Sequence, residues 1–142
     1  MMPSRHAAIS FGLGLVLWWV TSSFSSFVLT MIAGFLIDVD HFVEYFRFVL
    51  RGKQDKIFIL LHSVELLVPG WILAFSFKWQ TQAVVMTIGF LAHLASDYVY
   101  YRPRLSTYSL LYRALRGFDP ECLARKRGAD FSWTGRGPRT WW

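Results

Sequence analysis

The stretch Phe35–Phe46, "FLIDVDHFVEYF", decides how this chain folds, because it closes a long uncharged segment with four ionisable residues. These residues are Asp38, Asp40, His41 and Glu44, and their neighbours in the stretch are apolar or aromatic. Carboxylates are costly to place beside hydrocarbon. We therefore expect the cluster to lie at a membrane surface or to surround something that it binds.

The composition indicates a membrane protein. At 142 residues the chain is expected to form one domain. Hydrophobic residues make up 54% of it and aromatic residues 18%, and they are gathered into long blocks. The single cysteine, Cys122, excludes an internal disulfide and a cysteine-based zinc ribbon.

The uncharged run from Ala7 to Ile37 is too long for one bilayer crossing of about 20 residues, so it must fold back on itself. The polar break "TSSFSS", Thr21–Ser26, predicts a tight turn there. Pro69 and Gly70 predict a kink in a later span. Four spans are expected, at about Ala7–Ser22, Phe24–Ile37, Ile57–Phe77 and Ala83–Tyr101.

The predicted fold is an all-α integral membrane four-helix bundle over residues 1–101, followed by a basic interfacial tail over residues 102–142. This topology puts 14 of the 15 lysines and arginines on one side and only Lys78 on the other. The positive-inside rule then makes both termini cytoplasmic. In an alternative interpretation, Arg5 and the following apolar run form a cleaved signal peptide, which would remove His6 and leave three spans.

In an up-and-down bundle, the ionisable residues of all four spans fall near the cytoplasmic end. Residues three or four positions apart share a helix face, as Asp38 and His41 do, and as His93 and Asp97 do. Imidazoles with carboxylates suit a divalent metal ion, with zinc favoured and manganese or iron as alternatives. The candidate metal ligands are His6, Asp38, Asp40, His41, His62, His93 and Asp97.

Simpler interpretations apply to single residues. A membrane histidine often makes an interhelical hydrogen bond, and a carboxylate at the end of a span, such as Glu44 or Glu65, is often merely interfacial. A metal site is favoured because all four histidines of the chain fall at one predicted depth.

These motifs, taken in order, resemble two families. "DVDH" at the end of a span, "HS" early in the next and "HLASD" in the last resemble the membrane-bound metal-dependent hydrolases, and the order is similar to that of the all-helical zinc-dependent phospholipase C superfamily. The resemblance covers Arg5 to about Tyr101, and it implies a bacterial-type inner membrane. It also implies that Asp38 or Asp40 holds a first metal ion together with His62, His93 and Asp97. His6 would help to hold a neighbouring metal ion.

The expected function is hydrolysis of a phosphoester, such as a phosphorylated lipid headgroup or a small phosphoester. Asp40 or Glu65 is the candidate general base. Arginines bind phosphate bidentately, and the candidates are Arg104, Arg113 and Arg116. Two alternatives stay open: a scaffold in which the metal only pins the helices, and a metal or proton transporter. The second is disfavoured because the opposite halves of the spans are nearly all apolar.

The tail is expected to lie on membrane lipids. "YSLLYRALRGF" and "DPECLARKR", residues 108–118 and 119–127, predict two short interfacial helices, with Trp141 and Trp142 as interface anchors. Arginines and aromatic residues also suit nucleic acid. Beside four spans, an anionic lipid surface is the simpler partner.

Overall fold

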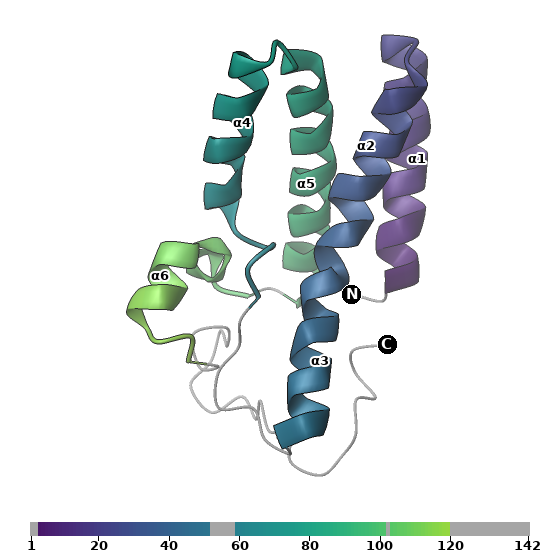
Figure 1. Cartoon of the computed structure of the whole chain (residues 1–142). Helices are drawn as coiled ribbons and strands as arrows, with labels where there is room; N and C mark the ends of the chain where they lie inside the picture. The colour runs from purple at the N-terminus through teal and green to yellow at the C-terminus, as the bar shows by residue number, and fades with distance from the viewer. Residues whose placement is uncertain (1–2, 52–58, 102, 120–142) are drawn as a thin grey trace.

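The computed structural model describes residues 3–51, 59–101 and 103–119, and every regular element in these ranges is a helix (Figure 1). The prediction of an all-α fold is confirmed. The helices α1, α2, α5 and α4 lie side by side, α3 continues beyond α2, and α6 lies below α4 (Figure 1). The elements in chain order are α1 (Pro3–Thr21), α2 (Phe24–Phe35), η1 (Leu36–Asp38), α3 (Val39–Arg51), η2 (Val64–Leu66), α4 (Leu67–Ser76), α5 (Gln80–Tyr101), η3 (Leu105–Tyr108) and α6 (Leu110–Leu115).

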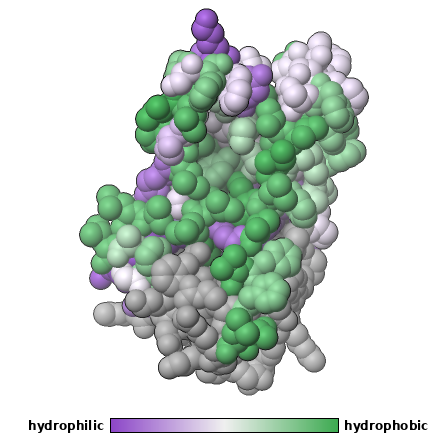
Figure 2. Space-filling view, in the orientation of Figure 1, coloured by the Kyte–Doolittle hydropathy of each residue, from purple (hydrophilic) through white to green (hydrophobic). Residues whose placement is uncertain are grey.

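Two helical segments, Phe24–Val43 and Gln80–Tyr100, are long and apolar enough to cross a membrane, and Val64–Ser76 is a shorter apolar helix. Large apolar side chains face outward, including Trp19 and Val68. In Figure 2 much of the visible face is hydrophobic. These findings support two candidate spans.

The predicted turn between the first two helices is confirmed. α1 ends at Thr21 and α2 begins at Phe24. Ser22 adopts a left-handed backbone conformation with φ of 52°. The hydroxyl of Thr21 donates to Ser26 Oγ at 2.7 Å, so the polar residues of this turn satisfy one another instead of water.

Helix α2 is central because its buried positions are small. Small residues let helix backbones approach closely. A Cβ on Gly34 would overlap the side chain of Ser10 on α1, and a Cβ on Gly89 of α5 would lie 3.0 Å from the carbonyl oxygen of Thr30. The buried residues of α2 are Ser26, Thr30, Ala33 and Gly34.

The third helix is shorter than the predicted Ile57–Phe77. Residues 59–63 are not helical, and helix begins with η2 and continues as α4 from Leu67. Pro69 lies in the first turn of α4, where its missing N–H costs no hydrogen bond. The proline therefore helps to start this helix, and the predicted kink is wrong.

The start of the predicted tail packs into the helical domain. Tyr108 is buried in a cluster with Ile37, Phe90 and Leu94, against which Leu67 packs. The hydroxyl of Tyr108 donates to the carbonyl of Leu94 at 3.3 Å. Of the two predicted tail helices, α6 matches the first. The second, and the tryptophans at 141 and 142, lie outside the described residues.

Candidate metal centre

The candidate ligands come from four segments that meet at one end of the bundle. Some of these ligands lie within α-helices, and others lie where the regular α-helix is interrupted. The helix that begins as α2 tightens to the 3-10 turn η1 before continuing as α3, and such turns often mark functional positions. The ligands are His6 on α1, Asp38 on η1, His62 in the segment before η2, and His93 and Asp97 on α5.

Four ligand atoms form a cage of the size that a zinc ion requires. Nε2 of His62 lies 3.1 Å from Nε2 of His93. Oδ1 of Asp38 lies 3.6 and 3.5 Å from these two nitrogens, and Oδ2 of Asp97 lies 3.7 and 3.5 Å from them. With zinc–ligand distances of about 2.0–2.1 Å, the corners of a tetrahedral site lie about 3.3 Å apart. The five distances all fall close to that value.

Both imidazoles turn Nε2 toward the cage. Nδ1 of His93 donates to the carbonyl of Gly34 at 2.8 Å, and Nδ1 of His62 donates to Oδ2 of Asp40 at 3.3 Å. In a neutral imidazole these partners fix the tautomer, so Nε2 presents a lone pair to the cage. Burial lowers the pKa of His62, but hydrogen bonds with Asp38 and Asp40 raise it to about 9, so without a metal ion a proton on His62 relieves the repulsion among these atoms. A divalent ion would take the place of that proton.

Asp40 orients His62 and is not one of the cage atoms. Its Oδ2 also accepts from the backbone N–H of Leu61 at 2.9 Å. Within the described residues its buried Oδ1 has no hydrogen-bond partner. Asp38 and Asp40 thus contact opposite edges of the His62 ring, which agrees with their placement on different faces of the chain.

His6 and His41 adjoin the cage on two sides. Nε2 of His6 lies 3.0 Å from Oδ1 of Asp97, and its ring stacks on His93 with ring centroids 4.0 Å apart. Nε2 of His41 lies 3.6 Å from Oδ1 of Asp38. The ligand atoms form two groups that share one carboxylate, His6–Asp38–His93–Asp97 and Asp38–His41–His62. Either group could hold a divalent ion, and because both include Asp38, that carboxylate would be common to the two.

Glu65 does not join either group. Its carboxylate accepts hydrogen bonds from the hydroxyl of Ser109 at 2.5 Å and from the backbone N–H groups of Leu110 and Leu111 at 2.9 and 3.2 Å. Glu65 therefore caps the start of α6 from another part of the chain. This contact explains how the α6 segment is held against the bundle.

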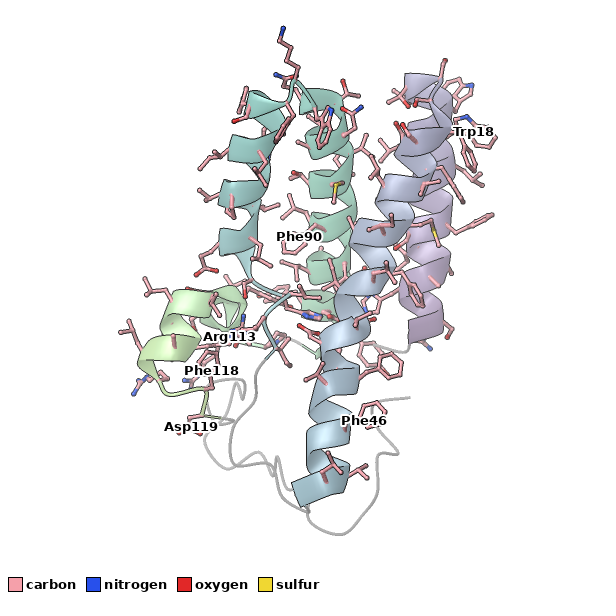
Figure 3. The ribbon with its side chains drawn as sticks, in the orientation of Figure 1. Trp18, Phe46, Phe90, Arg113, Phe118 and Asp119 are labelled. Atoms are coloured by element: carbon pink, nitrogen blue, oxygen red, sulfur yellow. The ribbon has the colours of Figure 1, made fainter. Side chains whose placement is uncertain are left out.

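Arg113 is buried and reaches toward the segment that carries His62. Figure 3 shows it extending from α6 toward the middle of the molecule. Its Nη2 donates to Oγ of Ser63, the residue after His62. Burial lowers the pKa of Arg113, and the carboxylates of Asp40 and Glu65 offset only part of this shift. Arg113 therefore supports the position of His62 and lies close to Asp40.

The other predicted site residues lie elsewhere. Arg104 and Arg116 are exposed, and Arg116 lies over the ring of Tyr112 at 5.9 Å. The side chain of Glu44 lies outside what the structure describes. Sequence reasoning missed the Gly34 carbonyl, which no side-chain pattern could reveal. It also missed Ser63, whose only signal was its place in "HS".

In comparisons with protein-family models, curated proteins and solved structures, no match was found.

Proposed function

We propose that this chain is a membrane-embedded, metal-dependent hydrolase of phosphoesters. The observation that carries the proposal is the buried cage of two imidazole nitrogens and two carboxylate oxygens at the spacing of zinc ligands. His62 and His93 are 5% and 2% exposed, so solvent does little to screen these groups. A bound divalent cation offsets the cost of burying the two carboxylates.

The ligand set favours a catalytic metal over one that only pins helices. Structural zinc sites are typically closed sets of four ligands in which cysteines predominate, whereas catalytic sites use histidine and carboxylate ligands. Here every grouped ligand is histidine or aspartate, and the two groups share Asp38. Paired metal sites are common in enzymes that cleave phosphoesters.

In this proposal, Asp38, His62, His93 and Asp97 would hold a divalent ion, which would supply Lewis-acid chemistry toward a phosphoryl oxygen and, with water as a further ligand, a nucleophile near neutral pH. The chain supplies orientation and proton transfer. Asp40 holds His62 in the tautomer that binds metal, a role different from the predicted general base. When one ion occupies the four-atom cage, His41 is not a ligand, and because its side chain is 36% exposed we assign proton exchange with the substrate to it.

Basic residues outside the cage suit an anionic lipid. Exposed Arg104 and Arg116 lie on the chain after α5, and Arg5 lies over the ring of Tyr100 at 5.6 Å. We extend the two candidate spans to four, adding α1 and α4, with the site at the cytoplasmic end. The excess of basic residues expected at that end supports this orientation. The resemblance to membrane-bound metal-dependent hydrolases agrees with the same interpretation.

A transporter is less well supported. Carrying a cation across the bilayer requires ionisable or polar groups at successive depths. At the other end of the bundle, the turn between α4 and α5 carries Lys78, which is exposed. Buried polar residues away from the site, as far as the chain is described, are the hydroxyl residues Ser10, Ser26 and Thr30.

The proposal is tested by assaying headgroup or phosphate release from a panel of phospholipids and isoprenoid phosphates with added zinc or manganese. Wild type should cleave at least one of them, and Asp97→Asn should lose activity and metal together. Asp119→Asn makes the same chemical change at an exposed position and should behave as wild type. A metal-loaded wild type that cleaves nothing on the panel would refute the proposal.

A further inference from the structure

An apolar groove of about 310 Å³ opens between α2, α4 and α5. Figure 2 shows a hollow in the hydrophobic face between these helices, with a small hydrophilic patch at its lower end. Phe90 lies in this region, between the helices, in Figure 3. At Gly70, which lines the groove, a Cβ would meet no atom within 4 Å, so that wall borders open space.

The lining of the groove is suited to hydrocarbon. Nearly all of its residues are aliphatic or aromatic. The polar atoms of Trp71 and Thr87 satisfy each other, because Nε1 of Trp71 donates to Oγ1 of Thr87 at 3.1 Å. These two side chains therefore need no hydrogen bond from a ligand. A polar ligand would lose hydrogen bonds to water on entering the groove and would gain none from these two side chains.

One end of the groove lies near the metal cage. Three of its lining residues are Ile37, Leu61 and Phe90. Ile37 and Leu61 immediately precede the cage residues Asp38 and His62 in the chain, and Phe90 lies one helical turn before His93. A molecule whose apolar part fills the groove therefore has its polar end in the neighbourhood of the cage.

We propose that the groove holds one hydrocarbon chain of a bilayer glycerophospholipid whose phosphate lies at the metal cage. This inference rests on the proposed function and deepens it, because it makes the substrate a lipid and not a small soluble phosphoester. The groove selects the substrate by its acyl chain, and burial of methylene groups provides the affinity. The candidate spans α2 and α5, which wall the groove, place it within reach of bilayer lipids.

The test compares binding of dioleoyl and dihexanoyl phosphatidate, which share a headgroup, to metal-loaded protein by native mass spectrometry. Gly70→Leu adds a side chain to the wall of the groove at a position where a Cβ meets no atom within 4 Å. Gly12→Leu is the matched control, since a Cβ there also meets nothing within 4 Å and Gly12 lies on α1, outside the groove. Gly70→Leu should weaken dioleoyl binding at least about tenfold and leave dihexanoyl binding unchanged. Gly12→Leu should change neither.

A second variant, Ala83→Leu, fills the groove from α5 and guards against a folding defect in the first. The inference is overturned if both filled variants bind dioleoyl phosphatidate as wild type does, or if wild type binds the two lipids equally. It is also overturned if the groove holds a second copy of the chain, in which case Gly70→Leu would convert a dimer to a monomer. Release of phosphate is measured in parallel. Groove-dependent binding without release would refute only the hydrolase, and release that is insensitive to groove filling would refute only the groove.

Discussion

At the scale of single residues, the two aspartates of "FLIDVD", Asp38 and Asp40, have different roles. Asp38 faces the cage, and Asp40 contacts the far edge of His62. Asp40→Asn keeps an oxygen that can accept from His62 Nδ1 but removes the charge that makes the imidazole a stronger ligand. We expect metal affinity to fall about 10- to 100-fold, measured by competition with a chelator.

Asp38→Asn changes a ligand that both groups share. It should therefore lower metal affinity more than Asp40→Asn does. Asp119→Asn, at an exposed carboxylate, serves as the control. Equal metal affinity in wild type and Asp40→Asn would show that the Asp40–His62 contact does not support metal binding.

His41 offers a second test at this scale. Because its side chain is the most exposed of the four histidines, we expect His41→Gln to lower kcat by about 10²- to 10⁴-fold, as loss of a general acid or base does. The ion in the His62–His93 cage should remain, as metal analysis would show. If His41→Gln empties the cage as well, His41 is a ligand on which the whole centre depends.

At the scale of helices, packing at the centre depends on glycine and serine. Gly34→Ala places a Cβ against the side chain of Ser10 and displaces the carbonyl that orients His93. Overpacking of this kind costs about 1–3 kcal/mol. We expect a lower Tm in detergent, partly restored by adding Ser10→Ala, while Gly12→Ala leaves the Tm unchanged. A Gly34→Ala protein as stable as the control would contradict the close α1–α2 contact.

The helices also show what could be read from the sequence. Uncharged length and the hydroxyl-rich break located α1 and α2, and spacing of three or four residues paired His93 with Asp97. The 3-10 turn η1 could not be foreseen, because it depends on packing around Asp38 and not on local composition. The same holds for Glu65, whose three hydrogen-bond donors lie more than 40 positions away. Long-range contacts of this kind leave no periodic signal.

At the scale of the whole molecule, one argument places the ligands and the basic residues at the same end. In a bundle of antiparallel helices, the start of one helix lies beside the end of the next. The depth of each ionisable residue in the bundle could therefore be predicted before any contact was known. The segment of η3 and α6 shows the limit of that reasoning. Its position on lipid stays a prediction, but the sequence did not indicate that Tyr108 and Arg113 would be buried.

The proposed orientation gives a topology prediction. In a protein whose native Cys122 is replaced by serine, a cysteine introduced by Lys78→Cys should react with a membrane-impermeant maleimide added to intact cells. One introduced by Arg116→Cys should react only after the membrane is opened. Both positions are exposed, so accessibility within the protein is matched. The reverse pattern would refute the orientation, and labelling of both from outside would favour the cleaved signal peptide.

The most direct test of the central claim is the metal content of the purified protein in mild detergent, measured by inductively coupled plasma mass spectrometry. Because two imidazole nitrogens and two carboxylate oxygens lie at the spacing of zinc ligands, we predict at least about one transition-metal ion per chain, with zinc the leading candidate. His62→Ala and His93→Ala should each lose that ion, and Asp119→Asn should keep it. A folded wild type that binds no added zinc, manganese or iron, and whose Tm is unchanged by chelators, would contradict the account.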